Sequence, residues 1–444
     1  MTETFSVIST TNDNKPVYHL NNIPGFNEFI KFNYDKNSFE SFMNDKFLVQ
    51  FDKIFTNSPT KQSYSLIRYN KNMLLNQDIN TIGLLRSLII NSSGKVVSFS
   101  PPKSIDWNHF LTLYPENNEN IIAEQFIEGT MINVFWDPNI GISGSWEIAT
   151  RSCVSAEIAF YFESGKPIVT FRTMFMEAVK EVGLDFNKLN PSYCYSFVLQ
   201  HPLNRIVVPF SKPSLYLISI YQIIQNDDGI INVYPIEINK LENVWSESSV
   251  KFPEIYKDWE NAEELIETYA SMNTNYQVVG IILKNLATGE RCKKRNPVYE
   301  NVRHLRGNQP KLMYHYLSLR KEGKVNEYLK FYPENKKEFA FFRKQLHDYT
   351  YALYNNYIRC YIKKEKPLKE FEDKYRTHMY NIHQIYINTL KEAGRHISNS
   401  VVIEYVNNIH STLLMYALNY DMRKRQVDIL QADADAEAES EALA

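Results

Sequence analysis

The chain has little of what holds small secreted or metal-bound domains together. It contains 4 cysteines in 444 residues, namely Cys153, Cys194, Cys292 and Cys360, and no two of them are closely spaced. Paired cysteine spacings are typical of zinc sites, and dense even sets in short chains are typical of disulfide frameworks. We therefore expect neither kind of site, and a reducing environment suits the protein best.

Long hydrophobic runs and an excess of either charge are also absent. No stretch approaches the roughly 18 consecutive apolar residues of a membrane span, and the N-terminus lacks the basic flank and apolar run of a signal peptide. Lys and Arg number 49 against 51 Asp and Glu, a net charge of -2. This balance excludes a generally basic nucleic-acid coat but not a local basic pocket. We expect no membrane contact and a cytoplasmic location.

Apolar residues are plentiful, at 44% against 23% charged residues, which is typical of a globular protein with a full core. Short apolar runs bounded by turn-forming residues predict strands between about residues 84 and 284. The expected strands cover 84–90, 95–99, 132–136, 146–150, 195–199, 205–208, 215–222, 230–234 and 278–283. Two helices are expected in the same region, at 173–182 and 262–272.

The pattern changes near residue 300, where apolar residues begin to recur at three- and four-residue steps, as they do on helices. The stripe at positions 339, 342, 346, 349, 353 and 357 is aromatic-rich and predicts a helix core rather than a base-stacking surface. The final residues alternate acidic residues with alanine and predict a disordered tail. We therefore divide the chain into an N-terminal subdomain (1–80), a sheet domain (81–299), a helical domain (300–428) and an acidic tail (429–444).

One stretch carries the main functional signal. Glu128 and Gly129 lie between apolar runs at 121–122 and 131–136, which predicts a strand, a tight turn and a second strand. This turn resembles the nucleophile motif of the phage-type RNA ligase family, within the superfamily of covalent nucleotidyltransferases. That motif reads Lys-x-Asp/Glu-Gly, and its lysine attacks the α-phosphate of a nucleotide. Here Phe126 stands in the place of the lysine.

Neighbouring segments resemble the same family in the expected order. Residues 83–90 and 95–103 resemble the Arg-Gly strand and the Phe-Pro-x-x-Lys turn, which implies that Arg86 and Lys103 face the nucleotide phosphates. Residues 148–152 resemble the Ala-Thr-Arg-Gly segment, with Arg151 in the arginine place. In the first and third segments serine replaces the usual glycine.

Three later segments complete the resemblance, which covers roughly residues 80 to 300. Residues 195–208 resemble motif III with Gln200 for a glutamate, and residues 279–284 resemble motif IV with Val279 for a glutamate. Residues 293–299 resemble motif V and keep both of its cations. The helical extension also resembles ligase-like proteins of large DNA viruses, for which host cytoplasm or virion would be the location. The implied fold class is α+β, an antiparallel-sheet nucleotidyltransferase (ATP-grasp-like ligase) domain followed by an all-α C-terminal domain.

The resemblance implies a set of nucleotide-binding residues: Arg86, Lys103, Glu128, Gly129, Arg151, Gln200, Lys284, Lys293 and Arg295. The catalytic groups, by contrast, are replaced. Phe126 has no lone pair with which to attack phosphorus, and magnesium prefers carboxylate oxygens, for which Gln200 is a weaker substitute and Val279 none. We expect no catalytic residue, no metal site and no required cofactor, with ATP or GTP together with magnesium as an optional ligand.

The leading hypothesis is therefore an RNA-ligase-like pseudoenzyme that binds nucleotide or RNA ends, with a protein partner for the helical domain as a further option. Two alternatives stay open. The chain could be an active RNA ligase or capping-type nucleotidyltransferase that uses Lys103 or Lys284 as a relocated nucleophile. It could also be a structural or virion-associated scaffold. The run 293–295 fits a solvated charge cluster as well as a phosphate site.

Overall fold

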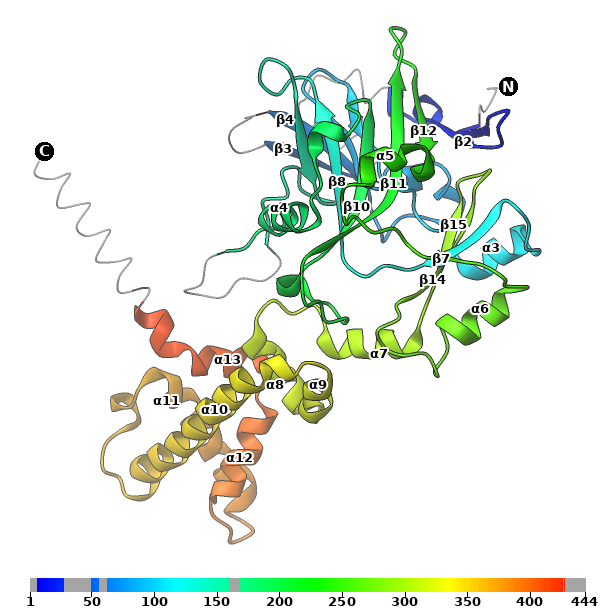
Figure 1. Ribbon diagram of the computed structural model, residues 1–444. Coiled ribbons are helices and arrows are strands. Elements are labelled where there is room, and N and C mark those ends of the chain that lie inside the picture. The colour runs from blue at the N-terminus through cyan, green and yellow to red at the C-terminus, as the bar shows by residue number, and fades with distance from the viewer. Residues whose placement is uncertain (1–5, 28–48, 56–61, 160–167, 426, 428–444) are drawn as a thin grey trace, which may run out of the picture. The chain divides into compact units, whose positions relative to one another are not determined.

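The computed structural model describes residues 6–27, 49–55, 62–159, 168–425 and 427 (Figure 1). The chain divides into two compact units, Met1–His304 and Leu305–Ala444. The named strands pair antiparallel and all lie in the first unit, whereas the described part of the second unit is helical. The predicted class, antiparallel sheet followed by a helical C-terminal region, is confirmed. The predicted acidic tail lies outside the described residues.

The largest sheet of the first unit has seven strands in the order β1-β2-β12-β11-β10-β8-β9. Its strands are β1 (Ile8–Thr10), β2 (Pro16–His19), β8 (Thr130–Asp137), β9 (Ser145–Ala149), β10 (Tyr193–Gln200), β11 (Ser214–Gln225) and β12 (Ile231–Ile236). Alternate residues of a strand point to opposite faces, and both faces of β10 are buried. Tyr195 and Phe197 join the core under helix α4 (Phe171–Val182), whereas Cys194 joins a second core on the other face.

Two four-stranded sheets accompany it. One has the order β13-β7-β14-β15 and the other β3-β4-β5-β6. The strands of the first are β13 (Ile255–Tyr256), β7 (Ile121–Gln125), β14 (Gly280–Asn285) and β15 (Arg291–Arg295); those of the second are β3 (Val49–Phe55), β4 (Ser63–Tyr69), β5 (Leu88–Ile90) and β6 (Val96–Ser98). Besides α4, the helices of this unit are α3 (Trp107–Leu113), α5 (Glu242–Trp245) and α6 (Ala262–Tyr269), and α7 (Pro297–Arg306) leads into the second unit.

Helix α4 shows how the sequence sets these elements. The Thr170 side chain accepts a hydrogen bond from the Thr173 backbone N–H at its start, and Gly183 ends it in the left-handed region at φ 68°. Its buried residues recur at helical spacing and face the seven-stranded sheet: Phe171, Met174, Phe175, Ala178, Val179 and Val182. The predicted helix at 173–182 is confirmed.

Some expected boundaries are wrong. Residues 84–90 do not form one strand, because Ile82–Leu84 is a 3-10 turn and only Leu88–Ile90 pairs with neighbours. Residues 205–208 are irregular rather than a strand, since the backbone N–H groups of Val207 and Val208 bond a side-chain carboxylate instead of a neighbouring strand. Helix α6 ends at Tyr269, three residues earlier than predicted.

The predicted strand, turn and strand around Glu128 also needs correction. Both strands exist, but β7 pairs with β13 and β14, whereas β8 pairs with β9 and β10. The two strands therefore belong to different sheets and do not form a hairpin. Residues 126–129 are the link that carries the chain from one sheet to the other.

The second unit is built of helices α8 (Leu312–Lys321), α9 (Val325–Phe331), α10 (Lys336–Tyr357), α11 (Asp373–Ile385), α12 (Asn399–Asn408) and α13 (Ser411–Leu418). Short π-helical turns extend α10 and α11, at Ile358–Ile362 and Tyr386–Leu390. The predicted stripe on α10 is buried at Phe339, Leu346, Tyr349, Leu353 and Tyr357, which confirms it as core. None of the described helices combines the length and apolar character needed to cross a bilayer.

Candidate functional site

The link between the two sheets has a backbone that only glycine permits. Gly129 has φ 148°, and a Cβ there would lie 2.4 Å from the carbonyl oxygen of Leu199 and 2.6 Å from a methyl group of Val198. Both distances are far shorter than a van der Waals contact, so no side chain fits at this position. At the other end of the link, the backbone N–H of Phe126 donates to the carbonyl of Gly280 at 3.2 Å. The link is thus held against both sheets.

Glu128, between these anchors, is buried and fully engaged with protein groups. Its carboxylate accepts hydrogen bonds from the backbone N–H of Val207 at 3.0 Å and of Val208 at 3.1 Å. Burial raises the pKa of this carboxyl, and the hydrogen bonds from Val207, the Tyr299 hydroxyl and Val208 oppose that rise. Its contacts make Glu128 a group that fixes the link.

Phe126 projects from the link toward two cations of β15. Lys293 Nζ lies 5.7 Å and Arg295 Cζ lies 5.5 Å from the centroid of the Phe126 ring. Because alternate strand residues share a face, Lys293 and Arg295 meet the ring together while Lys294 between them points the other way. Contacts of this kind are attractive, since the ring face carries partial negative charge.

These two cations belong to a larger group, which we call the cation cluster. It consists of Lys71, Arg86, Lys103, Arg151, Arg291, Lys293 and Arg295. Burial, together with repulsion among these charges, lowers the pKa values of several members. The sequence analysis assigned five members of this cluster to nucleotide binding: Arg86, Lys103, Arg151, Lys293 and Arg295. The structure therefore brings most of the predicted cations together.

Two guanidinium groups of the cluster share neutral partners. Arg291 is buried, and its Nε and Nη2 donate to the carbonyls of Pro102 at 2.9 Å and Pro101 at 3.3 Å. Arg86 Nη1 donates to the same Pro101 carbonyl at 3.3 Å. Burial, followed by repulsion from Arg291, lowers the pKa of Arg86 to about 10. Neither arginine forms an ion pair with a carboxylate in the part of the chain that the structure describes.

The lysines of the cluster have lowered pKa values. The pKa of Lys293 is lowered to about 7. The causes, largest first, are loss of hydration and repulsion from Arg295, Arg86, Arg291 and Lys103. The Lys293 side chain nevertheless reaches the surface. Burial and the arginines likewise lower the pKa of Lys103, whose Nζ donates to the carbonyl of Ser104 at 2.7 Å. The neutral amine of Lys293 is therefore easier to reach near neutral pH than that of an ordinary lysine.

Two other predicted residues, Lys284 and Gln200, lie outside the cation cluster, and Arg151 has a further contact within it. Lys284 Nζ pairs with the buried carboxylate of Glu124 at 2.6 Å. Both ends of the Gln200 amide are used, because Nε2 donates to the Glu128 carbonyl at 3.0 Å and Oε1 accepts from Ser214 at 3.1 Å. Arg151 lies over the ring of Tyr69 at 5.2 Å, and its Nε is buried without a hydrogen-bond partner among the described residues.

The residues at this site do not fit a magnesium ion. Among the described residues, no group of three or more His, Cys, Asp and Glu side chains is placed to hold a metal. The nearby carboxylates already have partners, since Glu128 accepts from backbone N–H groups and Glu124 pairs with Lys284. Val279 is buried and apolar. Hard divalent ions need several oxygen ligands, whereas this site presents cations.

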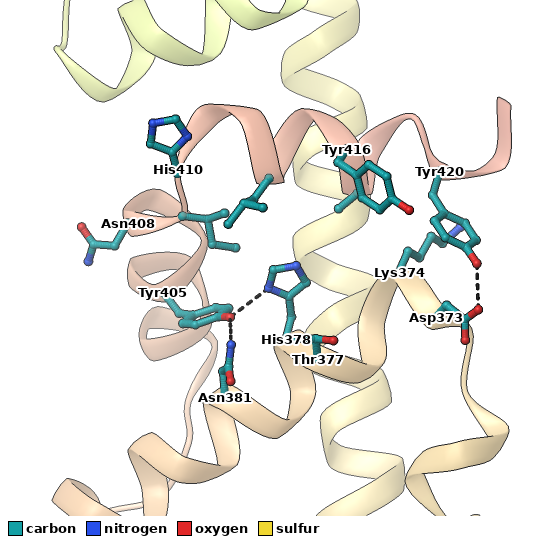
Figure 2. Close-up of a pocket in the computed structure, with 13 residues that line it drawn as sticks. Asp373, Lys374, Thr377, His378, Asn381, Tyr405, Asn408, His410, Tyr416 and Tyr420 are labelled. Carbon is teal, nitrogen blue, oxygen red and sulfur yellow. Dashed lines mark hydrogen bonds between the residues drawn. The ribbon is translucent and has the colours of Figure 1, made fainter. Parts of the chain in front are cut away.

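A hollow of about 590 Å³ lies in the helical unit (Figure 2). Helices α11, α12 and α13 line it, and the Tyr405 hydroxyl accepts from Asn381 at 3.2 Å and bonds His378 Nδ1 at 2.8 Å. Lys374 on its wall already pairs with Asp421 at 2.8 Å and with Glu372 at 2.9 Å. This hollow therefore lacks the uncompensated cations that a phosphate needs.

The sequence analysis missed Arg291 and Lys71. Arg291 begins the strand that carries Lys293 and Arg295, and its place in the alternation of β15 puts it on their face. That signal was present in the sequence, two residues before the motif V match. Lys71 follows β4 in a turn, and no pattern in the sequence marks it.

Comparison with known proteins gives two relatives, whereas no protein-family model matches the chain. The RNA ligase of Rhodothermus phage RM378 is 24% identical over 257 residues, which are 47% of this chain and 56% of that protein. The immediate-early protein ICP-46 homolog of Invertebrate iridescent virus 6 is 25% identical over 320 residues, 68% of this chain and 65% of that protein. The chain therefore spans less than two thirds of the length of either relative.

Solved structures give weaker likenesses. An archaeal ATP-dependent RNA ligase has a TM-score of 0.39 at 11% identity and covers 69% of this chain and 75% of its own. A variant of the Naegleria gruberi RNA ligase, solved with ATP and Mn, has a TM-score of 0.32 at 17% identity and covers 46% of this chain and 57% of its own. The predicted resemblance to RNA ligases and to a protein of a large DNA virus is confirmed by the two sequence relatives.

Proposed function

We propose that this relative of phage RNA ligases is a pseudoenzyme that binds the phosphates of a nucleotide or of an RNA end without covalent nucleotidyl transfer. The observation that supports it most is the pair Arg86 and Arg291, whose guanidinium groups repel each other and bond only carbonyl oxygens. Desolvated cations without a counter-charge are costly. A bound phosphate would supply that charge and accept charge-assisted hydrogen bonds.

The absence of turnover is argued from the residues at the reacting positions. The Phe126 ring contacts Lys293 and Arg295 where the motif match places a lysine, and a phenyl ring cannot attack phosphorus. Gln200 is held by Glu128 and Ser214, and Val279 offers no oxygen ligand. Binding groups are thus present while the groups for the chemical step are replaced.

A charge-reversal experiment tests the binding site. The double variant Lys103→Glu and Lys293→Glu removes two cations of the cluster and adds two anions, so binding of ATP, GTP and 5′-phosphorylated RNA should fall at least tenfold. Lys294→Glu is the matched control, because it changes the neighbouring residue of the same strand on the opposite face. Fluorescence anisotropy and thermal stabilisation by the ligand provide the readouts. Unchanged binding in a folded double variant would contradict the proposal.

One observation favours the alternative of an active nucleotidyltransferase. Lys293 has a pKa lowered to about 7, and a neutral amine is a nucleophile. It could attack the α-phosphate of ATP or GTP, forming an N–P bond, releasing pyrophosphate and losing a proton to solvent. Lys284 is less suited, because its ammonium pairs with Glu124 at 2.6 Å, and the Lys103 amine donates to Ser104.

Intact-mass measurement separates these functions. The full chain is incubated with ATP or GTP and magnesium or manganese, then denatured without acid, which would cleave a phosphoramidate. The pseudoenzyme predicts no added nucleotide together with thermal stabilisation by nucleotide. An added nucleoside monophosphate overturns it, and peptide mapping should then find the adduct on Lys293. No adduct and no stabilisation would leave the scaffold role.

A further inference from the structure

We infer that the cation cluster takes its ligand as a free polyphosphate anion, and that magnesium weakens this binding instead of supporting it. The inference rests on the proposed function and names the ionic form of the ligand. It follows from the charges of the cluster, from the engagement of the nearby carboxylates and from the charge of the two forms of a triphosphate.

The first step concerns the charge of the cation cluster. Of the cluster members, Arg295 pairs with Glu300 at 2.8 Å. The other six, Lys71, Arg86, Lys103, Arg151, Arg291 and Lys293, form no ion pair with a carboxylate anywhere in the described ranges. Repulsion, chiefly from Arg151, lowers the pKa of Lys71, and burial followed by repulsion from neighbouring cations lowers the pKa values of Lys103 and Lys293. A divalent cation entering this field would be repelled by each of them.

The second step concerns the oxygens that a metal would need. Glu128 accepts from the backbone N–H groups of Val207 and Val208. Glu124 pairs with Lys284, and Glu300 pairs with Arg295 and with Arg303 at 2.8 Å. To bind magnesium, one of these carboxylates would have to leave its partner and uncover a cation. Protein oxygens for the metal are therefore costly to provide.

The third step concerns the ligand. A triphosphate ester carries more negative charge alone than when a magnesium ion neutralises part of it. Guanidinium groups bond phosphate oxygens in pairs with fixed geometry, and a metal on those oxygens would compete for them. The arginines and lysines can thus neutralise the phosphate charge that a metal ion neutralises in metal-dependent nucleotide sites. The better ligand is the free anion.

The shared chemistry is a triphosphate ester at a 5′ carbon, which a nucleoside triphosphate and a 5′-triphosphorylated RNA end both carry. The inference is supported if the nucleoside triphosphate or the RNA end binds more tightly in chelator than in magnesium. Which of the two ligands binds shows whether the natural ligand is a nucleotide or an RNA end. Inorganic tripolyphosphate is a third probe that carries the charge without base or sugar. It should also bind more tightly without magnesium if charge decides the preference.

Isothermal titration of the full chain tests the inference, using ATP, a triphosphorylated RNA 10-mer and tripolyphosphate, each in EDTA and in excess magnesium at constant ionic strength. We expect affinity at least tenfold higher in EDTA. Neutral Lys103→Gln with Lys293→Gln should reduce that ratio, whereas Lys294→Gln, on the opposite face of β15, should keep it. Binding that requires magnesium would overturn the inference and leave the proposed function standing. No binding in either buffer would overturn the proposed function itself.

Discussion

At the scale of single residues, Phe126 stands where the motif match places a lysine. This difference affects the charge balance of the cation cluster as well as the nucleophile. The ring lies within 5.7 Å of Lys293 Nζ and 5.5 Å of Arg295 Cζ, and it attracts both cations where a lysine would repel them. A phenyl ring at this position therefore relieves part of the repulsion in the cluster and offers no amine. Under the proposed function, one side chain accounts both for the missing chemical step and for the stability of the cation cluster.

Substitution of Phe126 tests this role in stability. Phe126→Leu removes both cation contacts and should lower the free energy of unfolding by roughly 1 to 2 kcal/mol. Phe126→Lys removes them and adds a like charge, so it should destabilise the free protein further. Polyphosphate should recover more stability in Phe126→Lys than in Phe126→Leu. Urea unfolding with and without tripolyphosphate measures both effects, and equal stability of the two variants would contradict the argument.

The lowered pKa of Lys293 predicts a pH dependence of binding. With a pKa of about 7, Lys293 is charged at pH 6 and mostly neutral at pH 8, and a bound anion favours the charged form. Affinity for a polyphosphate should therefore fall as pH rises above 7, approaching about tenfold for each pH unit.

Lys293→Arg is the control for that prediction, because a guanidinium stays charged across this range while the ligand titrates identically. Titrations at pH 6, 7 and 8 should show a steeper fall for the natural protein than for the variant. Parallel curves would mean that another group causes the pH dependence.

At the scale of elements, the link from β7 to β8 organises the site. It crosses between two sheets, and Glu128 fixes it by binding the irregular segment at 206–208. Phe126 is thereby held on the sheet that carries β15, while Gly129 enters the sheet that carries β10. Phe126 meets Lys293 and Arg295 of the cluster because hydrogen bonds and the close approach of Gly129 hold this connection at both ends.

Glu128→Gln tests that element. The change replaces an acceptor oxygen by an NH₂ group that faces backbone N–H donors, so it should cost roughly 2 to 3 kcal/mol of unfolding free energy. Tyr299→Phe, which removes one hydroxyl donor to the same carboxylate, should cost less, about 1 kcal/mol. Glu263→Gln on the exposed side of α6 is the control. A Glu128→Gln protein with an unchanged denaturant midpoint would show that the link is not fixed by this residue.

The elements also show what the sequence could and could not predict. Helix α4 and the stripe on α10 were predicted because apolar spacing is a local signal. Most of the cluster was predicted in a different way, from the resemblance of successive segments to the motifs of the RNA ligase family. The sequence could not show that β7 and β8 enter different sheets, that Glu128 bonds residues 206–208, or that Lys71 approaches the arginines, since each depends on contacts between distant segments.

At the scale of the whole molecule, the net charge of -2 hides an uneven distribution. Residues 305–425, nearly all of the described helical unit, carry almost twice as many Lys and Arg as Asp and Glu. A basic surface favours polyanions without regard to sequence. The cluster of the first unit would bind a terminal phosphate, whereas the helical unit would bind the phosphates of a longer strand.

This distribution predicts that the affinity for RNA depends on the length of the RNA. A 5′-phosphorylated RNA of 20 nucleotides should bind at least tenfold more tightly than one of 5 nucleotides at low salt, and its affinity should fall more steeply with salt, because more counterions are released. Lys103→Glu with Lys293→Glu should weaken the short RNA more than the long one, since the long RNA keeps its contacts to the helical unit. Anisotropy titrations at several salt concentrations measure both slopes. Equal affinities and slopes for the two lengths would confine RNA to the cation cluster and leave the basic helical unit to a protein partner.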